Sequence, residues 1–386
     1  MDVPGPDAGA ARTPRALART RRRAGLSGIH GALRGNSDAA IRYAERAIAL
    51  ASELGLPRPA RALSCRGLAR AEIGDPGGLD DQREAITLAI QAGNGHEAAV
   101  FHHNFALALA AWGGPAAALE EARGAASFAR ARGLTGVAEG LQGLIADMLA
   151  DAGEFDEALA ILAEITERPA DEDLSNLFQA RSVEARLLAL RGESAKMADK
   201  LDWIEATSRE FGSPGYAVGG LATSAAARSA VGQTKAAATL LTEIDAIPGA
   251  HEFPGYAAFL PEMVRTALAI GDPQLAERLV GGVEPRFPVA EHALVAASAA
   301  LTEARGDLQA AADSYADAVA RWERLGVVPE QAFALLGQGR CLLGLNRPTE
   351  ATPVLQHAAE IFGRLQAVPA LAETDALLER ATELSS

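Results

Sequence analysis

Residues 306–318, GDLQAAADSYADA, contain the pattern that decides the fold of this 386-residue chain. A glycine and an aspartate open the stretch, and apolar residues follow at positions 311, 315 and 318. Residues three and four apart lie on one face of an α-helix. Glycine reaches the positive φ that ends a helix, and an aspartate beside it can cap the next one. The stretch therefore predicts a tight turn followed by a helix with a small-residue face.

The same turn recurs along most of the chain. Successive turns are 39 or 40 residues apart, except for one spacing of 35 residues between Gly271 and Gly306. A fixed period of this length is typical of stacked helical repeats, which can run to great length as one body. The turns are centred on Gly35, Gly74, Gly113, Gly153, Gly192, Gly232, Gly271 and Gly306, with Asn346 in the ninth place.

Three columns of small or aliphatic residues share the register of these turns. Seven positions before the turn, eight of the nine residues are Gly or Ala. The columns five and twelve positions after it contain residues such as Ala158 and Ile165, or Ala311 and Ala318. Small residues at fixed places let two antiparallel helices approach closely. We therefore predict an all-α fold, a right-handed α-solenoid of about nine antiparallel helix pairs.

The pattern Gly-Asp-Leu-x-x-Ala-x-x-x-Tyr-x-x-Ala of residues 306–318 resembles the second-helix signature of tetratricopeptide repeats, and residues 35–47 and 153–165 repeat its outline. The resemblance covers residues 26–366 and implies a superhelix whose first helices line a concave groove. The period exceeds the usual length of about 34 residues, which implies helices extended by about a turn. A HEAT-type array has a similar unit length, but the turn chemistry favours the tetratricopeptide type.

We predict three segments. Residues 1–25 are rich in Pro, Gly and Arg and are expected to form a disordered basic leader. Its arginines could contact nucleic acid or a membrane surface, but a solvated tail is favoured. Residues 26–366 form the superhelix, and residues 367–386 a capping helix that covers its end. The amino end shows no comparable cap, which suggests that upstream sequence is missing.

Composition excludes several classes of protein. The formal charge of −14 and the pI of about 5.1 disfavour nucleic-acid binding by the repeat body. No stretch is long and apolar enough for a membrane span, and no signal peptide is visible. Cys65 and Cys341 lie far apart in the array and are predicted to be small buried thiols, so a cytoplasmic location is expected.

No catalytic or cofactor motif is present, and we predict no enzyme, no cofactor and no metal. The three lysines, Lys196, Lys200 and Lys235, do not follow glycine, so a P-loop is excluded. Gly-x-Ser-x-Gly, His-Glu-x-x-His and Cys-x-x-Cys motifs do not occur either. His96 and His103 could share a helical face, but a metal site would need further ligands.

Residues 344–362 and 367–375 are similar to the last repeats of bacterial LuxR-type ATPase regulators and of class III adenylate/guanylate cyclases with an AAA-type ATPase module. In those families a helical array accompanies the enzyme or DNA-binding parts, so the resemblance implies the array alone. Two functions stay open. One is a protein-interaction scaffold that uses the concave groove. The other is a sensor or regulatory segment for signal transduction or transcription regulation, whose catalytic parts are absent from this chain.

The expected partner is a protein or peptide, and self-association through an exposed N-terminal repeat is a further prediction. In the family's arrangement, residues six before each turn point into the groove, where they could bind carboxylates or amides of a peptide. The alternative is that these charges only solvate the inner wall. The candidate partner-binding residues are Asp147, Arg186, Arg265 and Arg340 in that column, with Arg61, Glu72, His103, Asp151 and Gln179 in other inward-facing columns.

Overall fold

Helices stacked in chain order build the molecule. The computed structural model describes residues 37–167, 174–193 and 196–385, and this part of the chain contains no strand. The helices are α2 (Ser37–Glu53), α3 (Ala60–Glu72), α4 (Gly77–Gln91), α5 (Gly95–Arg130), α6 (Thr135–Asp151), α7 (Phe155–Thr166), α8 (Leu174–Arg191), α9 (Ala198–Phe211), α10 (Pro214–Ala230), α11 (Thr234–Asp245), η2 (Tyr256–Phe259), α12 (Leu260–Ala269), α13 (Pro273–Val280), α14 (Pro288–Ala304), α15 (Leu308–Leu325), α16 (Val328–Gly344), α17 (Pro348–Leu365) and α18 (Val368–Ser385).

From the second pair to the ninth, the turns found in the sequence join the two helices of a pair. Gly74, Gly153 and Gly306 have φ of 94°, 85° and 86°, conformations that favour glycine. The ninth turn has Asn346 at φ 59°, and asparagine tolerates this region better than most residues. Gly114 has φ 80° and divides α5 into the two helices of its pair. The predicted all-α solenoid is confirmed, whereas the leader at residues 1–25 and the helix expected before Gly35 lie outside the described residues.

The small-residue columns form the contacts within and between pairs. Ala158, Ala237, Ala311 and Ala351, all five positions after a turn, are 0% exposed. The larger residues nine positions after the turn are buried beside them, for example Leu355. One large apolar core runs from the third pair to α18, and a smaller one joins the first pairs. None of the described helices has the length and apolarity that crossing a membrane requires.

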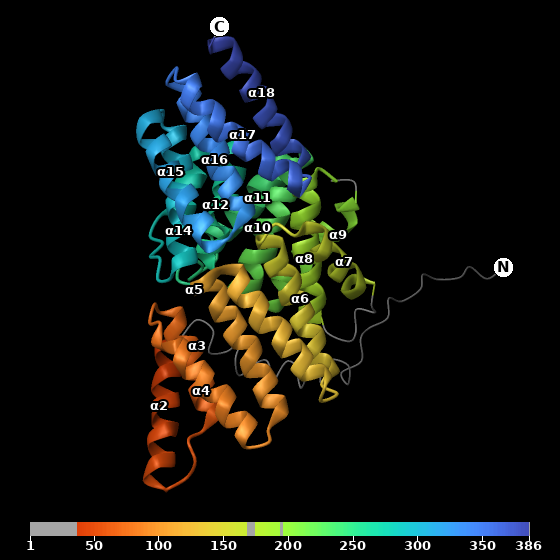
Figure 1. The fold of residues 1–386 in the computed structure, drawn as a ribbon, viewed down its shortest axis with the longest axis vertical. Coiled ribbons are helices and arrows are strands. Elements are labelled where there is room, and N and C mark those ends of the chain that lie inside the picture. The colour runs from red at the N-terminus through yellow and green to blue at the C-terminus, as the bar shows by residue number, and fades with distance from the viewer. Residues whose placement is uncertain (1–36, 168–173, 194–195, 386) are drawn as a thin grey trace, which may run out of the picture.

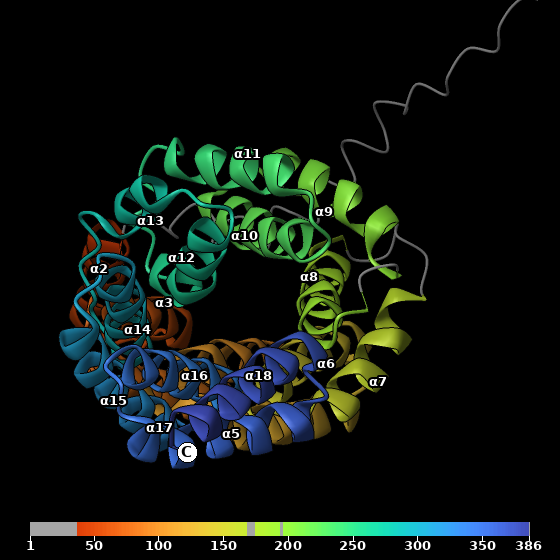
Figure 2. The same ribbon diagram turned by 90° about the horizontal axis from the view of Figure 1, so that it is seen from above.

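The stacked pairs curve into a superhelix (Figure 1). In Figure 2 the chain turns counter-clockwise from α3 through α6, α8, α10 and α12 while it rises toward the viewer, so the superhelix is right-handed. The first helices α8, α10, α12 and α16 lie inside, and the second helices α9, α11, α13 and α17 lie outside. The first helices therefore form the concave wall.

The second superhelical turn lies directly on the first. We call this contact the seam. A Cβ added to Gly74 would lie 2.7 Å from the carbonyl oxygen of Arg286, and Gly114 faces Leu325 in the same way. Gly153 and Gly192 continue the seam against α16, α17 and Pro369 of α18. The turn between α3 and α4, the second pair, thus meets the connection between α13 of the seventh pair and α14 of the eighth pair. One superhelical turn therefore takes about five and a half pairs.

Candidate functional site

Charged side chains from four first helices face one another on the concave wall. We call them the inner ring. They come from α6 and α8 in the first superhelical turn and from α12 and α16 later in the chain, so the ring joins parts of the molecule that are distant in sequence. Its members are Asp147, Asp151, Arg186, Glu262, Arg265 and Glu330.

Arg186 of α8 binds two carboxylates of the neighbouring first helix. Its Nη2 donates to Asp147 Oδ1 at 2.9 Å, and its Nη1 donates to Asp151 Oδ1 at 3.0 Å. The two aspartates are four residues apart on α6 and therefore lie on one face. Each of the three side chains is 27 to 29% exposed. The contact between Asp147 and Arg186 follows from the repeat, because the two residues are 39 positions apart and so occupy the same place in adjacent repeats.

Arg265 of α12 binds a carboxylate two repeats further along the chain. Its Nη1 and Nη2 donate to Oε2 and Oε1 of Glu330 at 2.6 and 2.7 Å, a bidentate pair. The guanidinium also lies 4.1 Å from the ring centroid of Phe333. The intervening first helix, α14, has Ala300 at the place that Arg265 occupies in its own repeat. Because alanine is short, the long side chains on either side can meet across it.

Glu262 lies between the two arginines and forms no ion pair within 4.0 Å among the described residues. It precedes Arg265 by three positions on α12, so both face the same side. Burial raises the pKa of the Glu262 carboxyl, and the charges of Arg186 and Arg265 only partly oppose this. Glu262 is therefore the one carboxylate of the ring that is not paired with an arginine of the described residues.

The ring is an acidic and enclosed environment. Four carboxylates face two guanidinium groups, which leaves two negative charges when all are ionised. Burial raises the pKa of Asp151 to about 6, although Arg186 opposes the shift, and the charge of Glu330 adds to it. These side chains are individually half-buried, but protein surrounds the space they share, and that enclosure disfavours the charged acids.

Arg340 belongs to a separate network at the carboxy end. Its Nε and Nη2 donate to Glu303 at 2.8 and 2.9 Å, and its Nη1 donates to Glu373 of α18 at 2.8 Å. The Tyr315 hydroxyl donates to the same Glu303 at 2.7 Å. Burial and the Glu303 charge raise the pKa of Tyr315. This network ties α14, α15, α16 and α18 together.

The remaining candidate residues lie apart from the ring. Arg61 is exposed and donates to Glu97 of α5 at 2.8 Å, and Glu72 accepts from the Ser37 hydroxyl at 3.0 Å. His103 is half-buried in α5, and Gln179 is half-buried in α8. The structure thus brings together Asp147, Asp151, Arg186 and Arg265 in the inner ring, whereas Arg61, Glu72 and Arg340 take part in other contacts.

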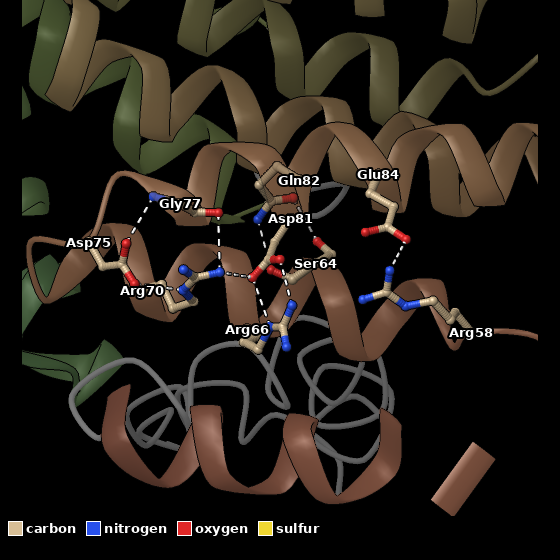
Figure 3. A network of polar contacts seen from close by, with 9 residues as sticks. All are labelled: Arg58, Ser64, Arg66, Arg70, Asp75, Gly77, Asp81, Gln82 and Glu84. Atoms are coloured by element: carbon tan, nitrogen blue, oxygen red, sulfur yellow. Dashed lines mark hydrogen bonds and ion pairs between the residues drawn. The ribbon is translucent and has the colours of Figure 1, made fainter. Parts of the chain in front are cut away.

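Figure 3 shows a further polar network, which joins α3 to α4 within the second pair. Asp81 accepts from Arg66 at 2.8 and 2.6 Å and from Arg70 at 2.9 Å, and Arg70 also binds Asp75. Although burial raises the pKa of Asp81, the hydrogen bonds from Arg66 and Arg70 outweigh it and keep the pKa low. The partners satisfy one another inside a single helix pair, so this network holds the pair together.

Sequence reasoning missed two ring members, Glu262 and Glu330. Neither lies in the column six positions before a turn. Glu262 could have been found from its spacing of three residues to Arg265, which places both on one helical face. No comparable sequence pattern indicates Glu330, because it stands in the first turn of α16 and meets Arg265 only through the curvature of the array.

Cysteine and metal chemistry add nothing to this site. Cys341 is buried and Cys65 is only half-buried, so the prediction of two buried thiols is wrong for Cys65. Both thiols are free. Within the described ranges, no three His, Cys, Asp or Glu side chains are grouped so that they could hold a metal ion. His102 instead contacts Glu121 of the same pair.

Comparison with known proteins identifies no family for this chain. No family model and no curated protein matches the chain. One solved structure, described as a circular tandem repeat protein with novel repeat topology and enhanced subunit contact surfaces, aligns with 96% of this chain over 95% of its own. The sequence identity is 15% and the TM-score 0.22, too low to transfer any property. The similarity to LuxR-type regulators and cyclases therefore rests on the quoted residues alone.

Proposed function

We propose that this protein is a non-catalytic interaction scaffold that binds a segment of a partner protein at the inner ring. The observation that supports this most directly is the excess of two carboxylates over guanidinium groups in the inner ring, which four helices form. An unpaired carboxylate such as Glu262 is costly in these surroundings, and a cationic group of a partner would relieve that cost.

The partner segment is cationic in this proposal. Arg186 and Arg265 already bind carboxylates of the protein itself, so an acidic partner would have to displace them. An Arg or Lys side chain of the partner meets Glu262, which has no guanidinium in ion-pair range, without breaking an existing pair. The overall charge of −14 would also attract a basic segment.

Binding to a peptide array tests the proposal. Immobilised peptides of matched length with basic, acidic or neutral composition are probed with wild type, with Glu262→Gln and with Glu210→Gln. Glu210 is exposed on the outer helix α9 and serves as the matched control. We expect wild type and the control to prefer basic peptides, and Glu262→Gln to bind them about fivefold more weakly, the effect of losing an ion pair of about 1 kcal/mol.

Two results would refute the proposal. One is the absence of any preference for basic over acidic peptides at low salt. The other is a Glu262→Gln variant that binds basic peptides as well as the Glu210→Gln control does. Higher salt should weaken the binding in all cases, because the attraction is electrostatic.

A further inference from the structure

The seam joins two kinds of edge. Each kind of edge also occurs once more in the molecule, where no other described residue covers it. We call the row of turns within helix pairs the turn edge, and the row of connections between pairs the joint edge. In the seam, the turn edge of the first superhelical turn supports the joint edge of the second. The turn edge of the second superhelical turn is uncovered, since a Cβ added at Gly232, Gly271 or Gly306 meets nothing within 4 Å.

Among the described residues, the joint edge of the first superhelical turn leaves Leu54 and Leu56 exposed. A Cβ added at Gly55, Gly93 or Gly133 also meets nothing within 4 Å. Figure 1 places the α2–α3 connection at the lower end of the molecule and the turn between α16 and α17 at the upper end. The two free edges therefore lie at opposite ends of the superhelix axis.

Side chains at the same position relative to their turn differ in exposure between the free joint edge and the joint edge that lies in the seam. Leu54 stands 19 residues after its turn and is 62% exposed, whereas Leu325 and Leu365 at the same position are 9% and 2% exposed. Two residues further on, Leu56 is 58% exposed. Its counterparts Val327 and Ala367 are 8% and 1% exposed. Leu54 and Leu56 are therefore apolar side chains on the joint edge of the first superhelical turn that no turn edge of the described residues covers.

We propose that a second copy of this chain places its free joint edge on the free turn edge of the first, so that the superhelix continues from one molecule into the next. The seam within one chain shows that the two kinds of edge fit each other. Burying leucines that are about 60% exposed provides a hydrophobic driving force.

This contact joins two different surfaces, and so the assembly is head to tail. A heterologous contact of this kind does not close on two copies and forms open chains. It differs from self-association through the N-terminal repeat alone, which would use one surface on both copies. It also does not depend on the inner ring, because the ring lies on the concave wall and the edges lie at the ends.

Light scattering coupled to size-exclusion chromatography tests the proposal with the full chain. The joint-edge variant is Leu54→Glu with Leu56→Glu, and the turn-edge variant is Val231→Glu with Gln233→Glu. All four residues are exposed, so the helices should be retained, and circular dichroism verifies this. Ala316→Glu, exposed in the middle of α15 and away from both edges, is the control.

We expect the mass of wild type and of the control to rise with concentration above the 39.9 kDa of one chain. Each edge variant alone should remain at the mass of one chain. An equimolar mixture of the two variants should reach the mass of two chains and stop there, because one intact junction remains. The proposal is overturned if wild type keeps the mass of one chain at every concentration, if only the joint-edge variant prevents association, or if the mixture stays at one chain.

Discussion

The turn glycines are alike in sequence and in backbone conformation, but they differ in their surroundings. Gly74 and Gly306 both open a second helix, with φ of 94° and 86°. A Cβ on Gly74 would lie only 2.7 Å from the carbonyl oxygen of Arg286, whereas a Cβ on Gly306 would face open space. Glycine is therefore required at position 74 for two reasons, the positive φ and the close approach of the next superhelical turn.

We expect Gly74→Ala to destabilise the protein clearly more than Gly306→Ala does. The second substitution costs only the positive φ, about 1 kcal/mol. The first adds a clash with a backbone carbonyl, and overpacking of this kind costs about 1 to 3 kcal/mol more. Urea unfolding followed by circular dichroism measures both. Equal midpoints for the two variants would mean that the seam is absent in solution.

Asp151 gives the inner ring a dependence on pH. Its pKa in the folded protein is raised to about 6, from an ordinary value of about 4 in the unfolded chain. The folded state therefore binds the proton more tightly between these values, and this contribution to stability is lost as pH rises through 6. We expect the midpoint of urea unfolding to increase from pH 7 to pH 5 through this group.

Asp151→Asn isolates the contribution. Asparagine cannot ionise, so the gain between pH 7 and pH 5 should shrink by about 1 to 2 kcal/mol relative to wild type. Arg186 retains Asp147 in this variant, so the guanidinium is not left unpaired. If stability depends on pH identically in wild type and variant, Asp151 titrates normally and the ring is more open to solvent than this structure indicates.

At the scale of the helix, packing depends on small residues at fixed places. Ala311 and Ala316 lie on the same helix, α15, but Ala311 is 0% exposed and Ala316 is exposed. We expect Ala311→Phe to destabilise by about 1 to 3 kcal/mol through overpacking, and Ala316→Phe to change stability by less than about 0.5 kcal/mol. Thermal melting of both variants provides the measurement, and a normal melting curve for Ala311→Phe would contradict the register.

The elements could be predicted from the sequence because each depends on local chemistry. The positive φ at Gly153 and the burial of Ala158 five residues later follow from turn geometry and helical period. The seventh pair was harder to place, since α12 and α13 have only 10 and 8 residues and irregular chain connects them to their neighbours. The spacing of 35 residues between Gly271 and Gly306 reflects this irregularity in the sequence.

The candidate site could be predicted only in part, for a reason that belongs to the whole molecule. Asp147 and Arg186 meet between adjacent repeats, so the register alone placed them together. Arg265 meets Glu330 two repeats away, and Asp151 is close enough to Glu330 to interact with its charge. These contacts depend on how far each pair rotates relative to the last, which many small packing differences set and no local pattern records.

The stacking of one superhelical turn on the other produces the enclosed ring, the seam and the two free edges. It also explains why residues of α16 and α18 take part in contacts with α6 and α8. A solenoid with the same helix pairs but an open pitch would expose Gly153 and separate Asp151 from Glu330. The closed pitch is therefore the central claim about this molecule.

A distance measured across the seam tests that claim most directly. Spin labels at Glu154→Cys and Arg364→Cys, two exposed positions beside the contact of Gly153 with Leu365, are used in a Cys65→Ala background. Cys341 is buried, which raises the pKa of its thiol to about 12, so it should remain unlabelled. Pulsed electron paramagnetic resonance should give one short and narrow distance between labels that are 210 residues apart in sequence. A long and broad distribution would contradict the stacked superhelix.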